Sequence, residues 1–187
     1  MSHLNPVLTQ KTLLDRAVLN AQTDEEVGYI TQVWVDWHLH QVVGFTCSLG
    51  FGSQLQRSFR WSQIEAIGLS DLYVSSQQPN PSPFEVSDTI DFRIGHNLYT
   101  NTDHCMGRLV DYIVDPNSGA ITCYRFSIRR IRQLTDTSYE VRYSLPPKAI
   151  RQITAKQMRL HPGATQKVQS IAMGKKIIFP DASPMCS

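Results

Sequence analysis

Residues 104–126 read HCMGRLVDYIVDPNSGAITCYRF, and they repeat without a gap the pattern of residues 25–47, EEVGYITQVWVDWHLHQVVGFTC. In both segments a glycine precedes a run of alternating apolar residues, an aspartate ends the run, and a second apolar run follows. The matched pairs, all 79 positions apart, include Gly28 with Gly107, Ile30 with Leu109, Val35 with Val114, Asp36 with Asp115 and Val42 with Ile121. A fixed internal offset is typical of a duplicated structural unit.

Each copy predicts a β-hairpin. Residues 29–36 alternate between two faces and are rich in β-branched and aromatic side chains, which favours a strand over a helix. Residues 37–41 are a plausible hairpin connection to a second strand. In the second copy, residues 115–119 read DPNSG, which is strong turn chemistry between two antiparallel strands.

A second pair of segments extends the duplication. Residues 60–74, RWSQIEAIGLSDLYV, resemble residues 145–160, LPPKAIRQITAKQMRL, with Ile64 and Ile67 matching Ile150 and Ile153. Each segment predicts a short helical turn next to a short strand. The offset here is 86 and no longer 79, so about seven residues are inserted in the second copy, most simply in the turn at residues 132–139.

These patterns predict an all-β protein of two tandem small antiparallel β-barrels with short helical turns. Residues 1–12 are expected to form a loose arm. Residues 75–87 are rich in Ser, Gln and Pro, a composition that predicts a linker. The expected organisation is a first barrel at 13–75, a linker at 76–95, a second barrel at 96–162 and a C-terminal extension at 163–187.

The composition and the distribution of charge indicate in which compartment the protein is expected and what kind of partner it binds. No apolar run approaches the roughly 20 residues that span a bilayer, and the first residues lack a signal-peptide pattern, so we expect a soluble, cytoplasmic protein. Four widely spaced cysteines suggest ordinary buried thiols in a reduced compartment. Residues 1–95 hold 5 Lys and Arg against 10 Asp and Glu, a balance of −5, whereas residues 96–187 hold 13 against 6, a balance of +7.

The repeated pattern resembles the PRC-barrel family, the β-barrel shared by the H subunit of photosynthetic reaction centres and a ribosome-maturation protein. The resemblance rests on EEVGYITQVWVD, QVVGFTC and RSFRWSQIEAIG in the first copy, and on MGRLVDYIVDPNSGAITCYRF and LPPKAIRQI in the second. The tandem arrangement is similar to that of cyanobacterial PRC-barrel proteins. The resemblance implies protein–protein docking without a shared catalytic site, and it is compatible with a place at the periphery of a photosynthetic membrane.

One group of residues suggests metal chemistry. Asp36, His38 and His40 would share one face if the strand continued through them, and all three are metal-ligand types. The alternative is a turn, in which Asp36 and its counterpart Asp115 bind nearby backbone N–H groups. We favour the turn, because the second copy does not keep the histidines. With no phosphate loop, catalytic triad or paired carboxylates in the sequence, we expect no enzyme activity, no metal and no cofactor.

Partner binding is expected on the basic second half. Arg129, Arg130 and Arg132 form its densest charge, which fits either a carboxylate-rich or phosphate partner or a charged edge strand that resists aggregation. Lys148 and Arg151 extend this surface. In the acidic half, Trp37 lies in a predicted turn and is expected to be an exposed binding residue, although it could equally cover the junction between the barrels.

The function that these features predict is a non-catalytic, protein-binding adaptor in the assembly or regulation of a photosynthetic or other large complex. The alternative is an RNA- or ribosome-associated maturation factor that uses the basic second domain. Binding that weakens steeply with salt would favour RNA.

Overall fold

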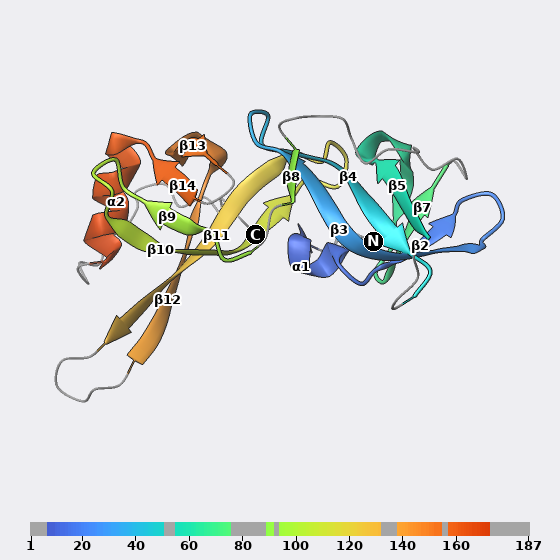
Figure 1. Ribbon diagram of the computed structural model, residues 1–187, viewed down its shortest axis with the longest axis horizontal. Coiled ribbons are helices and arrows are strands. Elements are labelled where there is room, and N and C mark those ends of the chain that lie inside the picture. The colour runs from blue at the N-terminus through green and yellow to red at the C-terminus, as the bar shows by residue number, and fades with distance from the viewer. Residues whose placement is uncertain are drawn as a thin grey trace, which may run out of the picture. The chain divides into compact units, whose positions relative to one another are not determined.

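The structure is a computed structural model that describes residues 7–50, 55–75, 89–91, 94–131, 138–154 and 157–172. The prediction of an all-β protein is confirmed: strands dominate and form two separate sheets (Figure 1). The described residues contain two short α-helices, α1 (Gln10–Leu13) and α2 (Pro162–Ala172).

The first repeat forms one sheet, whose strands run in the order β5-β4-β3-β2-β7-β6. A single 3₁₀ turn, η1 (Trp61–Gln63), connects β5 to β6, and β8 (Thr89–Asp91) pairs with β3. The bounds are β2 (Ala17–Asn20), β3 (Glu26–Asp36), β4 (Gln41–Ser48), β5 (Gln56–Arg60), β6 (Ile64–Ile67) and β7 (Asp71–Val74).

The second repeat forms the other sheet in the order β12-β11-β10-β9-β14-β13. The 3₁₀ turn η2 (Pro147–Ala149) connects β12 to β13, as η1 connects β5 to β6. The bounds are β9 (Asn97–Tyr99), β10 (Cys105–Val114), β11 (Ile121–Ile131), β12 (Ser138–Leu145), β13 (Ile150–Ile153) and β14 (Gln157–Leu160). Each strand takes the place of its counterpart in the first sheet, so the duplication seen in the sequence extends to the strand order.

Among the described strands, each sheet contains a parallel pair. β2 runs parallel to β7, with Val18 opposite Leu72, and β9 runs parallel to β14, with Leu98 opposite Met158. All four of these side chains are fully buried. A hairpin can connect only antiparallel neighbours, so a parallel pair leaves no turn signal in the sequence between its strands. The parallel pairs form because apolar strands that are distant in the chain are buried together.

The matched glycines at the start of β3 and β10 have the same unusual backbone. Gly28 has φ +145° and Gly107 has φ +144°. A Cβ on Gly28 would lie 2.6 Å from the carbonyl oxygen of Ser48, and the counterpart at Gly107 would meet the carbonyl oxygen of Ser127. The two serines are also 79 positions apart. Glycine is required in both copies because the neighbouring strand passes too close for a side chain.

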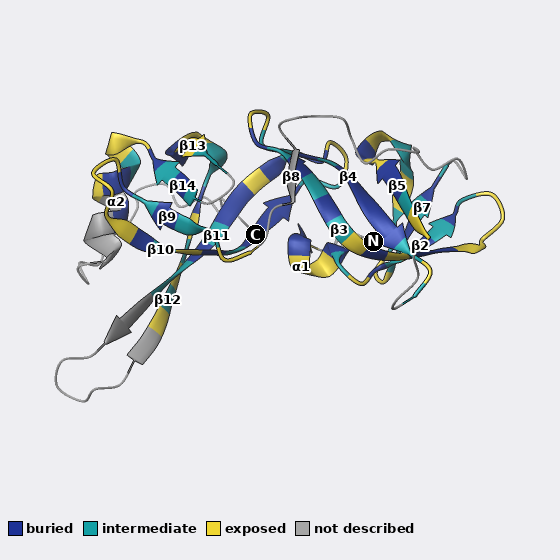
Figure 2. Ribbon diagram, in the orientation of Figure 1, coloured by how far each residue is buried: buried dark blue, intermediate teal, exposed yellow. Residues whose placement is uncertain are grey.

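The chain divides into two compact units. Unit 1 comprises Met1–Phe92 together with Val114–Ile121, and unit 2 comprises Arg93–Ile113 together with Thr122–Ser187. Along β3 and β4, buried residues are interspersed with half-buried and exposed ones (Figure 2). In unit 1 the buried rings of Phe45 and Phe59 stack with centroids 5.7 Å apart, and in unit 2 Phe126 stacks on Tyr143 at 5.6 Å.

The expected loose arm at residues 1–12 is wrong for its last five residues. Leu8–Thr9 form β1, and α1 follows it, with Thr9 as the N-cap that accepts a bond from the N–H of Thr12. Leu8 and Leu13 are 2% and 1% exposed. Burial of these two leucines stabilises a segment that its mixed composition did not mark as structured.

Candidate interaction surfaces

The residues of the suspected metal site lie in a turn. β3 ends at Asp36, and the Oδ1 atom of Asp36 accepts bonds from the N–H groups of His38 at 2.9 Å and Leu39 at 3.0 Å. Asp115 does the same for Asn117 at 2.9 Å, so the turn interpretation of both aspartates is confirmed. The rule that alternate residues share a face holds only within a strand. Nowhere in the described part of the chain do three or more metal-ligand side chains come together.

The expectation that Trp37 is exposed is wrong. Its side chain is 5% exposed. An indole ring carries a large apolar surface, so the turn is stabilised when the ring packs inward instead of facing water. Trp37 is therefore a packing residue, and any part it has in binding must be indirect.

A symmetric pair of backbone bonds joins the β10–β11 turn to the β3–β4 turn. The N–H of Val42 donates to the carbonyl of Gly119 at 2.8 Å, and the N–H of Ile121 donates to the carbonyl of His40 at 2.7 Å. Residues 40 and 42 are the repeat counterparts of 119 and 121, so the two bonds are equivalent. Gln41 forms an isolated bridge with Ala120, its own counterpart. This pairing fixes the β10–β11 turn within unit 1.

Both sheets end in a short edge strand that carries an exposed charge. β6 is the last strand of the first sheet and β13 is the last strand of the second. Glu65 in β6 and Arg151 in β13 occupy equivalent positions, 86 residues apart, and both are exposed. Lys148, in η2 before β13, is exposed too. The duplicated edge is therefore acidic in one copy and basic in the other.

The predicted arginine cluster is only partly within the described residues. Arg129 and Arg130 belong to β11, where their backbones pair with Glu140 and Tyr139 of β12, but their side chains lie outside the described set. Arg132 lies outside it altogether. Of the expected basic binding residues, Lys148 and Arg151 are those that the structure places on the surface.

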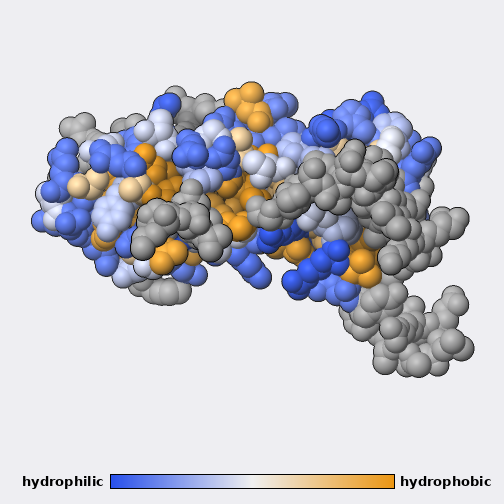
Figure 3. Space-filling view, turned by 180° about the vertical axis from the view of Figure 1, so that it is seen from behind, coloured by the Kyte–Doolittle hydropathy of each residue, from blue (hydrophilic) through white to orange (hydrophobic). Residues whose placement is uncertain are grey.

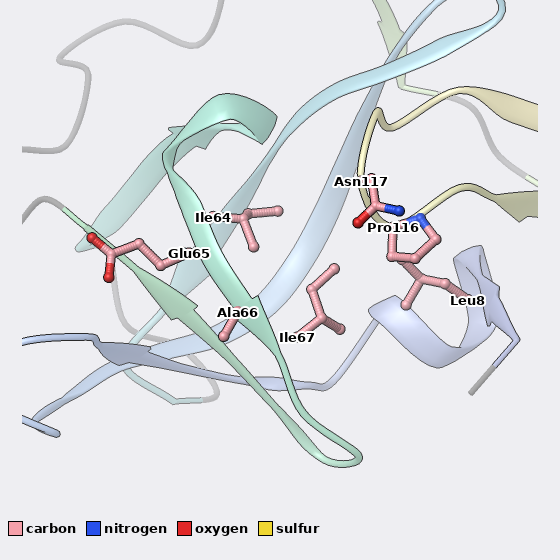
Figure 4. A pocket seen from close by; sticks show the side chains of 7 residues that line it. All are labelled: Leu8, Ile64, Glu65, Ala66, Ile67, Pro116 and Asn117. Atoms are coloured by element: carbon pink, nitrogen blue, oxygen red, sulfur yellow. The ribbon is translucent and has the colours of Figure 1, made fainter. Parts of the chain in front are cut away.

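A pocket of about 280 Å³ lies in unit 1 beside β6. Its walls are Leu8, the four residues of β6, and Pro116 and Asn117 of the β10–β11 turn. In Figure 4, Ile64 and Ile67 point toward Pro116 and Leu8, whereas Glu65 points away from them. Small-molecule sites usually have roughly 300–1,000 Å³, so this pocket suits single side chains better than a whole cofactor.

The described walls of the pocket lack the groups for acid–base chemistry. Among them, Glu65 is the one titratable residue. A lone exposed carboxylate has no second group with which to exchange a proton during a reaction. The arrangement can bind an apolar side chain and a neighbouring positive charge.

Exposed apolar residues concentrate on unit 1. Figure 3 shows hydrophobic residues gathered into a patch on the face of this unit seen from behind. Within the described part of the chain, six of the seven exposed large hydrophobic residues belong to unit 1, and Leu69, just after β6, is the most exposed at 81%. The six are Val7, Tyr29, Leu39, Leu49, Leu55 and Leu69. A contiguous apolar patch is typical of an interaction site, but these six residues lie on separate strands and loops and do not by themselves define one.

The described cysteines differ in exposure. Cys47 is buried and free, and burial raises the pKa of its thiol to about 11. Cys105 is free and exposed. Cys123 is fully buried in β11. Cys186 lies outside the described residues.

The pocket and the acidic edge were missed from the sequence, although one signal was present. At the 79-residue offset, Pro116 stands where the first copy has Trp37, and at the 86-residue offset Glu65 stands where the second copy has Arg151. Positions at which two copies differ in size or charge indicate where their surfaces have diverged.

In the described part of the chain, no helix has both the length and the apolar character needed to cross a membrane. A comparison with models of protein families gives no match to this chain, and a comparison with curated proteins gives none either.

Proposed function

We propose that this protein is a non-catalytic adaptor, built from two PRC-barrel-like repeats, that docks other proteins along the edge strands of its two sheets. One observation carries the proposal: the same edge element occurs twice, with Glu65 in one copy and Arg151 in the other, both exposed. Copies of one scaffold with opposite charge at the same position are suited to two differently charged surfaces. Charge complementarity of this kind sets specificity and association rate.

The basic edge is proposed to bind an acidic protein surface. Lys148 and Arg151 stand three positions apart on η2 and β13, and neither has an ion-pair partner among the described residues. Arg159 of the adjacent β14 differs, because it already pairs with Asp103. The two exposed cations are therefore available to a partner's carboxylates.

Charge reversal at the basic edge tests the proposal. Full-length tagged protein would be used to capture partners from an extract of the source cell, and co-eluting proteins would be identified by mass spectrometry. The double variant Lys148→Glu with Arg151→Glu should lose the partner by roughly tenfold or more, since rim charges control association. The matched control reverses Lys11 on α1 and Arg108 on β10, an exposed lysine and an exposed arginine. Equal capture by both double variants would contradict the proposal.

The same experiment separates the protein partner from RNA. Capture that survives nuclease treatment and changes modestly with salt supports a protein partner, whereas steep salt dependence and nuclease sensitivity would favour an RNA-associated factor. The resemblance to PRC barrels makes a subunit of a large complex, such as a photosynthetic assembly, the first class of partner to examine.

A further inference from the structure

We infer that the pocket beside β6 docks an extended segment of a partner protein in which aliphatic residues alternate with Lys or Arg. This inference rests on the proposed docking function. It adds a second binding surface to that function, distinct from the basic edge formed by Lys148 and Arg151. It is built from the backbone of β6, from the shape of the pocket and from the charge of Glu65.

The backbone of β6 can receive another strand. In the described residues β6 pairs with β7 on one side and with no strand on the other. An edge of this kind presents unpaired N–H and C=O groups, and an extended peptide that adds to it gains main-chain hydrogen bonds. β6 is also accessible, since Glu65 and Ala66 are exposed and the two isoleucines are half-buried.

A bulge in β6 sets the side-chain pattern of the pocket. The register against β7 shifts between Ile64 and Ala66. Residues three apart do not normally share a face of a strand, but an extra bulged residue brings Ile64 and Ile67 to the same side. Both therefore point into the pocket, and Glu65 points to the opposite side (Figure 4). A strand added here would place every second side chain in the apolar pocket and its intervening residues near Glu65.

The charge selects basic residues for the intervening positions. Glu65 is exposed and is the charged residue among those that line the pocket. Residues 1–95 carry a balance of −5, from 5 Lys and Arg against 10 Asp and Glu. Opposite charges directly across a strand pair are favourable and like charges are unfavourable. A segment that alternates valine or isoleucine with lysine or arginine fits both faces.

The first repeat supplies the substitution that should close the pocket. Pro116 forms one wall, and the equivalent position in the first repeat is Trp37, which is buried. Proline is much smaller than tryptophan, so Pro116→Trp is expected to fill the space with a residue that this turn already carries in the other copy. Glu65→Lys should reverse the charge preference without filling the pocket.

The test uses the full chain and defined peptides. A blocked six-residue peptide that alternates Val and Lys would be titrated against ¹⁵N-labelled protein, with a Val and Glu peptide for comparison. We expect the Val–Lys peptide to shift the amide resonances of Ile64–Ile67 and to bind at least tenfold more tightly than the Val–Glu peptide. Pro116→Trp should weaken binding at least tenfold, and Glu65→Lys should reverse the preference. Glu26→Lys, at an exposed carboxylate on β3, should leave both affinities within twofold.

A change in the peptide keeps the test decisive if a protein variant fails to fold. Alternate residues of a strand direct their N–H groups to opposite edges, so two methylated peptides are used, one N-methylated at every valine and one at every lysine. One of the two must lose the donors that face β6, and its binding to the wild-type protein should fall at least tenfold. Undiminished binding of both methylated peptides, no shifts at Ile64–Ile67 with millimolar peptide, or equal binding of the Val–Glu peptide would overturn the inference.

Two further outcomes would assign the pocket to another occupant and overturn the partner assignment. One is self-association of the wild-type chain that Pro116→Trp abolishes, which would indicate a second copy. The other is peptide binding that occurs only after residues 173–187 are removed, which would indicate that this segment of the chain occupies the pocket. Failure of the peptide test with capture still dependent on Lys148 and Arg151 would refute this inference and leave the proposed function standing.

Discussion

Replacing Gly28 or Gly107 with alanine tests whether the duplication preserved a physical constraint as well as a sequence pattern. A φ near +145° costs an L-residue about 1–3 kcal/mol. At Gly28 the new Cβ would also stand 2.6 Å from the carbonyl oxygen of Ser48, inside normal contact, so β3 or β4 must move. Losing the hydrogen bonds that pair the strands there would cost about 1 kcal/mol each. We expect each alanine to destabilise its unit by about 3–5 kcal/mol, a large part of a domain's stability.

Two other glycines separate the contributions. Gly50 has φ +115° with no atom within 4 Å of the position that a methyl group would take, so Gly50→Ala measures backbone strain alone and should cost about 1–3 kcal/mol. Gly163 lies in α2 with the same open surroundings and no positive φ. Gly163→Ala should be neutral or stabilise by up to about 1 kcal/mol, because alanine is the better helix former.

The assay is guanidinium unfolding followed by two probes. All three tryptophans, Trp34, Trp37 and Trp61, belong to unit 1, so tryptophan fluorescence reports Gly28→Ala, and far-ultraviolet circular dichroism reports both units. The strand-contact argument would be refuted if Gly28→Ala and Gly107→Ala cost no more than Gly50→Ala.

Three other predictions follow from burial. Trp37→Ala should destabilise unit 1 by roughly 3–5 kcal/mol in chemical denaturation, because a buried aromatic side chain is lost, and partner capture at a temperature where the variant stays folded should not change. Iodoacetamide at pH 8 should label Cys105 rapidly and spare Cys47, as detected by peptide mapping. The reason is that a pKa of about 11 leaves about one Cys47 thiol in a thousand ionised at this pH. Rapid labelling of Cys47 in the native protein would contradict its burial. Burial lowers the pKa of His40 below its ordinary 6.5, and this effect is larger than the opposite effect of the nearby Asp36 carboxylate. The unfolded chain then binds a proton at His40 more readily than the folded chain does. The contribution of His40 to the free energy of unfolding is therefore full above pH 6.5 and is lost as the pH falls below it. His40→Asn should remove this loss from a plot of melting temperature against pH.

The hairpins and the duplication could be predicted because local rules determine them. Alternation along residues 29–36, turn residues at 115–119 and a fixed offset between copies each depend on neighbours in the chain. The structure bears them out in β3, β4, β10 and β11 and in the identical strand order of the two sheets. Even the aspartates that end β3 and follow β10 have the turn role that their chemistry indicates.

The parallel pairs and the burial of Trp37 could not be predicted in the same way. β2 and β7 are about fifty residues apart in the chain, and their pairing is decided by which apolar faces meet after collapse. A tryptophan in a turn is compatible with exposure or burial, and only tertiary packing decides between them. The pocket depends on β1, on an edge strand and on a turn from the other repeat, so it exists only when three distant segments meet.

The two repeats agree at positions that shape the sheets and differ in charge at their edge strands, and these two facts have different physical causes. Gly28 and Gly107 match because a close strand forbids any side chain, and residues 40–42 pair with 119–121 through backbone atoms that tolerate substitution. Glu65 and Arg151 face water at the last strand of a sheet, where a change of charge costs the fold little. The surface positions were therefore free to acquire opposite charges while the core stayed fixed. In an adaptor this would let one architecture, used twice, contact two unlike partners.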